Sequence, residues 1–174
     1  MLKMFATQLS GVFKRLEEKE EFSFEDGARL LAQGPAGDGS IYILGLGEMK
    51  AIEAEALDGA EPLKHSRAFA RVEELTVADR VLVVTRFSDD AEAVAVARQL
   101  QEKGILFVGI STVREESEAG LDELADVHIN LALKKGLLPD DFGGRFGFPS
   151  SMAGLFAYYG LKFIIEDILA EYEE

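Results

Sequence analysis

Three short, uninterrupted apolar runs constrain the fold of this chain more than any other feature of its sequence. They are IYIL at 41–44, VLVV at 81–84 and ILFVGI at 105–110. Runs of this kind are typical of strands buried on both faces, as in parallel sheets. Helical segments are expected between them, near 48–58 and 89–103, the second ending at Gly104. Weaker strands near 64–70 and 127–132 would bring the sheet to five strands.

This alternation of strands and helices predicts an α/β fold, a three-layer sandwich with helices on both faces of the sheet. Before the sheet, apolar residues spaced three and four apart from Leu2 to Leu16 predict one amphipathic helix. Ser23 and Asp26 resemble a capping box that opens a second helix at about 24–33. A turn-rich loop at 34–40 follows. We therefore expect one domain over 1–174, with a helical extension at 1–34 and an α/β core at 39–174.

The composition excludes several classes of function. The chain has 18 basic and 32 acidic residues, a formal charge of −14, so neither a nucleic acid nor an anionic membrane is expected as a partner. The absence of cysteine excludes disulfides, thiolate catalysis and zinc–sulfur sites. No apolar run approaches the length of about 18 residues that a membrane span needs. The N-terminal region has no signal-peptide core, so we expect a cytoplasmic location.

The last segment, from about residue 151, predicts a long helix that is apolar on nearly every side between Leu155 and Ile165. Such a helix is buried, and near the end of a chain it is often buried by a second subunit. We therefore expect a homodimer or a higher oligomer. The alternative is that the helix packs wholly against its own sheet and the N-terminal helix.

Ligands of open parallel α/β sheets bind beyond the carboxyl ends of the strands, near the point where the strand order reverses. Glycines, hydroxyls and arginines follow the expected strands and would suit an anion there. The candidate ligand-binding residues are Gly45 and Gly47 after the first strand, Thr85, Arg86 and Ser88 after the third, Ser111, Thr112 and Arg114 after the fourth, and Arg145, Ser150 and Ser151 in the loop 140–151. Each also has a structural interpretation, because glycines permit tight turns and hydroxyls cap helices.

Two familiar phosphate-related sites do not fit this pattern. A dinucleotide-binding fingerprint, G-x-G-x-x-G/A, needs a small residue where this chain has Lys50. A phosphoacceptor receiver domain needs an aspartate after the third strand, where this chain has Thr85.

The order of these segments resembles the SIS (sugar isomerase) domain from about Gly39 onward. The stretch VVTRFSDDAEAVAVARQLQEKGILFVGIST at 83–112 carries most of the resemblance, supported by GLG at 45–47 and LADVHINL at 124–131. The resemblance implies a five-stranded parallel sheet in a flavodoxin-like order, assembly as dimers or tetramers, and binding of phosphosugars as isomerases or sensors. In size and layout the chain is most similar to single-domain phosphoheptose isomerases.

The chain departs from this family where the phosphate should bind. The family's loop reads roughly S-x-S-G-x-S/T-x-E, and the matching segment here is 85–92. Phe87 replaces a serine, Ser88 replaces the glycine, and Asp90 replaces a hydroxyl. Asp89 and Asp90 would repel a phosphate dianion at the start of the helix. The resemblance therefore implies a phosphosugar-binding sensor or regulator with a degenerate phosphate loop. The alternatives are a phosphosugar isomerase with a rearranged site and a protein-interaction scaffold with a vestigial one.

Catalytic residues are not evident from the sequence. Phosphoheptose isomerases use a glutamate on the first sheet helix and a histidine on the last helix, and the last helix here has no histidine. The remaining candidates for the base are Asp58, His65 acting in a neighbouring subunit's site, or one of the carboxylates Glu48, Asp89 and Asp90. His128 is expected to be a structural, hydrogen-bonded residue. No cofactor is expected; the alternative is a magnesium or calcium ion held by Glu48, Asp89 and Asp90.

Overall fold

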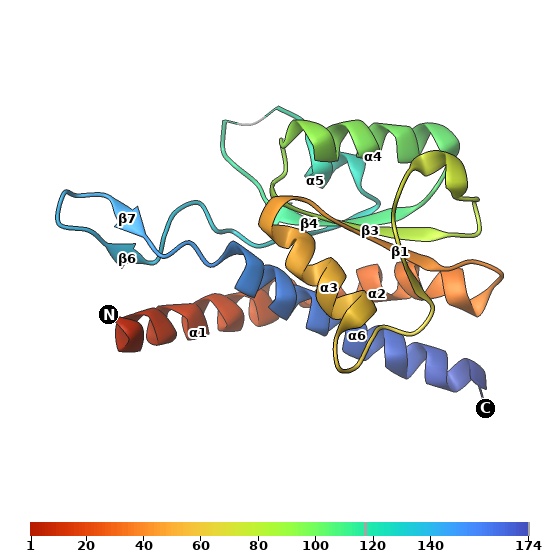
Figure 1. Cartoon of the computed structure of the whole chain (residues 1–174), viewed down its shortest axis with the longest axis horizontal. Helices are drawn as coiled ribbons and strands as arrows, with labels where there is room; N and C mark the ends of the chain where they lie inside the picture. The colour runs from red at the N-terminus through yellow and green to blue at the C-terminus, as the bar shows by residue number, and fades with distance from the viewer. Residues whose placement is uncertain (117, 174) are drawn as a thin grey trace.

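The computed structural model of the protein, which describes residues 1–116 and 118–173, is built around a five-stranded parallel sheet (Figure 1). Its strands are β1 (Ile41–Gly45), β2 (Ser66–Ala68), β3 (Arg80–Phe87), β4 (Phe107–Thr112) and β5 (Val127–Asn130). They lie in the order β2-β1-β3-β4-β5, and every neighbouring pair is parallel. This is the flavodoxin-like order that the resemblance implies. The order reverses between β1 and β3, which places the switch point there.

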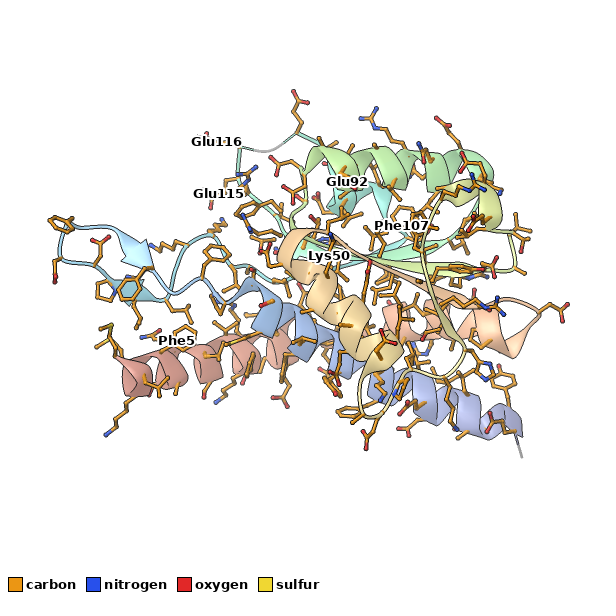
Figure 2. The ribbon with its side chains drawn as sticks, viewed as in Figure 1. Phe5, Lys50, Glu92, Phe107, Glu115 and Glu116 are labelled. Atoms are coloured by element: carbon orange, nitrogen blue, oxygen red, sulfur yellow. The ribbon has the colours of Figure 1, made fainter. Side chains whose placement is uncertain are left out.

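Helices cover both faces of the sheet, which confirms the three-layer sandwich (Figure 1). One face is covered by α1 (Leu2–Lys19), α2 (Glu21–Ala36), α3 (Lys50–Asp58) and α6 (Ser150–Glu173), and the other by α4 (Ala91–Lys103), the short α5 (Leu121–Leu124) and the 3₁₀ turn η2 (Val72–Glu74). Alternate side chains of β3 enter the two layers, Leu82 on the first side and Val83 on the second. Phe107 of β4 fills the space between the sheet and α4 (Figure 2).

The two N-terminal helices differ from the prediction at their junction. The second helix begins at Glu21, with only Glu20 between it and α1, and it continues to Ala36. Ser23 therefore lies inside the first turn, the helix start has no side-chain cap, and the capping-box prediction was wrong. Tertiary packing explains the longer helix, because α2 buries Ala28 and Leu31 in the same cluster as the sheet.

The glycine-rich segment after β5 forms a small antiparallel hairpin, β6 (Leu138–Pro139) with β7 (Arg145–Phe146). In Figure 1 this hairpin projects away from the sheet, beside the start of α1. The ring of Phe5 in α1, labelled in Figure 2, lies against Gly147. Most of the segment is therefore remote from the sheet, and only its last residues return before α6 begins.

None of the helices in residues 1–116 and 118–173 combines the length and the apolar character that a transmembrane segment needs.

Candidate ligand site at the switch point

The junction between β1 and α3 is a tight turn that only glycine permits. A Cβ atom at Gly45 would lie 2.1 Å from the carbonyl oxygen of Met49. The Gly45 N–H donates to Glu53 Oε1 at 2.7 Å, so this amide is already used within the protein. Gly47 has φ +59° and opens the 3₁₀ turn η1 (Gly47–Met49). The close approach at Gly45 supports the structural interpretation of that glycine.

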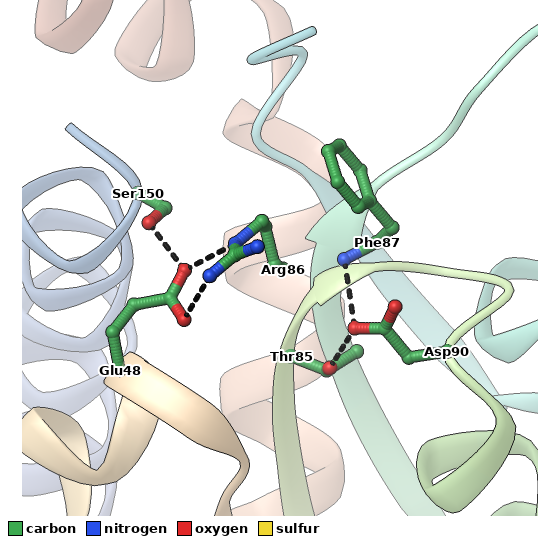
Figure 3. Close-up of polar contacts among 6 residues, drawn as sticks. All are labelled: Glu48, Thr85, Arg86, Phe87, Asp90 and Ser150. Atoms are coloured by element: carbon green, nitrogen blue, oxygen red, sulfur yellow. Dashed lines mark hydrogen bonds and ion pairs between the residues drawn. The ribbon is translucent and has the colours of Figure 1, made fainter. Parts of the chain in front are cut away.

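Glu48, on η1, links three elements of the switch point (Figure 3). Its Oε1 accepts hydrogen bonds from Arg86 Nε and Ser150 Oγ, both at 2.6 Å, and its Oε2 accepts one from Arg86 Nη2 at 2.8 Å. Arg86 belongs to β3 and Ser150 is the first residue of α6. The hydrogen bonds from Arg86, opposed by partial burial, lower the pKa of Glu48 to about 2. Glu48 is therefore a carboxylate at neutral pH.

A second carboxylate occupies the loop between β3 and α4. Asp90 is the N-cap residue of α4, and its Oδ2 accepts hydrogen bonds from Thr85 Oγ1 at 2.5 Å and from the Phe87 N–H at 3.2 Å (Figure 3). In the resembling family this loop holds a phosphate. Here the Thr85 hydroxyl and the Phe87 N–H are bound by the side chain of Asp90, whereas the buried Ser88 hydroxyl has no hydrogen-bond partner among the described residues. Ser88 is fully buried beneath Gly120, and its carbonyl accepts from the Leu121 N–H.

The other arginine at this edge of the sheet also faces an internal carboxylate. Arg114 Nη2 lies 2.7 Å from both carboxylate oxygens of Asp89. The guanidinium also lies 4.3 Å from the centre of the Phe87 ring, which meets the ring of Phe148 edge-on at 6.2 Å. The end of the long loop after β5 thus returns to the switch point through Phe148 and Ser150.

A hollow of about 280 Å³, which we call the switch-point hollow, lies between the ends of β1 and β3 and the start of α4. It is lined by Leu46, Gly47, Glu48, Thr85, Arg86, Asp90, Ala91 and Glu92. Its size is near the lower limit of small-molecule sites, enough for a phosphate group or part of a sugar. Three of its lining residues are acidic and one is basic, so an anion entering it would meet a net negative charge.

Several predicted ligand residues have other roles in the structure. Ser111 Oγ is 2.7 Å from His128 Nε2, and Thr112 Oγ1 accepts from the Leu133 N–H at 3.0 Å; both side chains are buried. Arg145 lies in the β6–β7 hairpin and donates to the carbonyl oxygens of residues 136 and 137. Of the predicted residues, Gly47, Thr85, Arg86 and Ser150 are the ones brought to the switch-point hollow or its rim. Ser151 is next to Ser150, partly buried.

Two of the candidate bases, Asp58 and His65, lie away from this hollow within the chain. Asp58 is the last residue of α3, the end farther from the β1 junction, and is exposed. His65 precedes β2, and its carbonyl accepts from the Ile41 N–H at the start of β1. His65 therefore lies at the amino ends of the strands, whereas the switch-point hollow lies at their carboxyl ends. The structural role expected for His128 is confirmed by its hydrogen bond to Ser111, and burial lowers its pKa to about 4.

The carboxylates considered for a metal do not form one site. Glu48 pairs with Arg86, Asp89 with Arg114, and Asp90 bonds to its own loop. Within the part of the chain that the structure describes, no three histidine, aspartate or glutamate side chains lie close enough together to hold a metal ion. The hydrogen bond between Glu48 and Ser150 was not predictable, because nothing in the sequence relates two residues so far apart.

Comparison with known proteins shows the family of the chain. Residues 1–169 match the family described as Domain of unknown function (DUF2529). The Uncharacterized protein YwjG of Bacillus subtilis (strain 168) is 43% identical over 173 residues, 99% of each chain.

Solved structures with low sequence identity share the same fold. One is a candidate sugar-phosphate isomerase from Listeria monocytogenes, with 15% identity, a TM-score of 0.71 and coverage of 97% of this chain and 88% of that one. The Vibrio vulnificus NanR protein complexed with ManNAc-6P has 13% identity and a TM-score of 0.70, over 99% of this chain and 64% of NanR. Phosphoheptose isomerase GmhA from Neisseria gonorrhoeae has 12% identity and a TM-score of 0.64, over 95% and 99%. The chain thus belongs to the DUF2529 family, and its fold is the one found in SIS-type phosphosugar proteins.

Proposed function

We propose that this protein binds a phosphosugar at the switch-point hollow and acts as a sensor or regulator, not as an isomerase. The observation that carries the proposal is that anion-binding side chains gather at this hollow without a suitable catalytic base. Arg86 presents a planar fork of donors, the geometry that matches phosphate oxygens. Ser150 adds a hydroxyl at the start of α6, where the helix dipole favours an anion.

The known structures support the ligand class. NanR, which shares this fold, was solved with ManNAc-6P, and phosphoheptose isomerase takes its name from a phosphosugar. The switch-point hollow occupies the position at which doubly wound α/β sheets bind ligands.

The chemistry of the hollow argues against isomerisation. An aldose–ketose isomerase needs a base whose pKa lies near neutrality, beside an acid that serves the carbonyl oxygen. While Arg86 holds Glu48, the pKa of Glu48 is about 2, and Asp90 accepts two hydrogen bonds from its own loop. A glutamate freed from such a pair has an ordinary pKa of about 4.3, still well below neutrality. No histidine lines the switch-point hollow among the described residues. A bound phosphosugar would therefore be held without proton transfer.

We also propose that the protein self-associates through α6. This helix buries Tyr158 and Leu161 within the chain but leaves the Phe163 side chain 59% exposed. A mostly apolar groove lies beside Phe163, lined by Phe24, Phe156, Tyr159, Gly160, Ile164 and three glutamates of α1 and α2. Both alternatives for α6 thus have support, because one side packs on the sheet and the other is available to a second copy.

Thermal unfolding with a panel of hexose and heptose phosphates, followed by a turnover assay, tests the binding proposal. A ligand at 100 times its dissociation constant should stabilise the native state by about 2.7 kcal/mol. We expect a rise in melting temperature with at least one phosphosugar, a smaller rise with the unphosphorylated sugar, and no conversion of the bound compound. Turnover would show an isomerase instead, and no response to any phosphosugar would refute the proposal and favour the scaffold.

A further inference from the structure

We propose that Glu48 is an intramolecular competitor for the ligand's phosphate, whose carboxylate occupies Arg86 and Ser150 until a phosphosugar displaces it. This inference rests on the proposed function and specifies how its site is controlled. In the structure the donors best suited to a phosphate are not free. One edge of the Arg86 fork, formed by Nε and Nη2, and the Ser150 hydroxyl are bonded to one carboxylate (Figure 3).

Phosphate and Glu48 cannot share these donors. Arg86 Nε and Nη2 already form the two-point contact that a phosphate would need. A phosphate placed beside the pair would stand about 5 Å from the Glu48 carboxylate, and the charges would repel each other. Arg86 supplies one positive charge, whereas Glu48, Asp90 and Glu92 supply three negative ones around the hollow. A phosphate at the other edge of the guanidinium, through Nη1, would still meet this repulsion, which favours exchange, with Glu48 leaving as the phosphate arrives.

Glu48 is also the carboxylate that can move. It lies on η1, a turn of three residues, and Gly47 before it has open space where a side chain would be. Its ion pair with Arg86 is accessible to solvent, with 29% of the Glu48 side chain and 51% of the Arg86 side chain exposed. Asp90 differs, because it directly precedes a helix of 13 residues and bonds to the buried Thr85 and to the Phe87 N–H. Exchange at Glu48 leaves these bonds of Asp90 in place.

Displacement would also change the contact between two parts of the fold. The bond from Ser150 to Glu48 joins the first residue of α6 to the β1–α3 junction. When the phosphate takes the place of Glu48, this direct link is replaced by one through the ligand. Occupancy of the hollow is thereby transmitted to the start of the helix whose exposed side we assign to self-association.

The test is calorimetric titration of the whole protein with ManNAc-6P, fructose 6-phosphate and inorganic phosphate. The variant is Glu48→Gln, which keeps the size of the side chain and removes its charge. The matched control is Glu74→Gln, because Glu74 also pairs with an arginine, Arg71, at 3.0 Å on the surface. Removing one charge about 5 Å from a phosphate dianion should tighten binding by about tenfold or more, even at the dielectric constant of water.

We expect Glu48→Gln to bind at least one of these probes about tenfold more tightly than the wild type, with Glu74→Gln unchanged. Binding by the variant alone would also support the inference. Equal, measurable affinities in the wild type and Glu48→Gln would overturn the inference and leave the proposed function standing. Weaker binding by Glu48→Gln would overturn it too, because Glu48 would then assist the ligand. Failure of both proteins to bind any probe would refute the proposed function, and the inference with it.

Discussion

The buried imidazole of His128 gives a quantitative prediction about stability in acid. Its Nε2 atom lies 2.7 Å from Ser111 Oγ, and Ser111 is fully buried in β4. Burial disfavours the charged imidazolium and lowers the pKa of His128 from 6.5 to about 4, although the nearby Asp122 carboxylate opposes this shift. At neutral pH the folded protein therefore keeps His128 uncharged.

The sign and size of the effect follow from this pKa difference. Between pH 6.5 and about 4 the unfolded chain binds a proton at His128 that the folded chain does not, so stability falls as the pH is lowered through this window. One pKa unit corresponds to about 1.4 kcal/mol, so the whole shift corresponds to about 3 kcal/mol. By pH 4.5 most of that loss, about 2–3 kcal/mol, should have occurred.

Urea unfolding of the wild type and of His128→Gln at pH 7.5 and 4.5 measures this loss. Glutamine preserves a polar side chain near Ser111 but does not titrate. The change with pH is compared, so a lower stability of the variant at both values does not matter. We expect the wild type to lose about 2–3 kcal/mol more than His128→Gln between the two pH values. Glu48, with its pKa lowered to about 2, contributes mainly at lower pH and equally in both proteins. Equal losses would refute the reasoning.

Three further predictions concern the site and the surface. Gly45→Ala places a Cβ atom 2.1 Å from the Met49 carbonyl oxygen, so it should lower the free energy of unfolding by about 2 kcal/mol or more in urea titrations. The control Gly11→Ala, with open space around it, should be neutral or stabilising. Arg86→Ala should weaken phosphosugar binding at least about tenfold in calorimetry. It should change the free energy of unfolding by less than about 1 kcal/mol, because the ion pair of Arg86 with Glu48 is partly exposed. Unchanged affinity would exclude Arg86 as a ligand residue. Phe163→Glu should shift a self-associated protein to monomer in light scattering, and an unchanged mass would place any interface elsewhere.

The layers of the fold were predictable because their signals are local and strong. The runs at 41–44, 81–84 and 105–110 became β1, β3 and β4, each buried on both faces. The α4 helix ends at Gly104, whose φ of +73° is the left-handed conformation expected of a glycine stop. The strand order came from the family resemblance, since apolar runs do not specify which strands are neighbours.

Features that depend on distant contacts were not predictable. The glycines of 143–147 indicated turns, but the direction of the β6–β7 hairpin, and with it the position of Arg145, depends on packing against α1. Ser23 and Asp26 had the spacing of a capping box, yet the packing of α2 against the sheet extended the helix beyond them. The partner of Arg86 was equally hidden, because Asp89 and Asp90 are closer in sequence than Glu48.

The carboxylates of Glu48 and Asp90 explain how the switch-point hollow can remain stable without a ligand. Arginine forks and helix starts that await a phosphate leave donors without partners, which costs stability if they are buried and attracts other anions if they are exposed. Here Glu48 bonds to Arg86 and Ser150, and Asp90 bonds to the Thr85 hydroxyl and the Phe87 N–H. Under the proposed exchange, the same contacts would lower the affinity for a phosphosugar, because part of the binding free energy would have to displace Glu48. A moderate affinity of this kind keeps binding reversible, as a sensor of a metabolite requires, and it gives no advantage to an enzyme whose donors should be ready for the substrate.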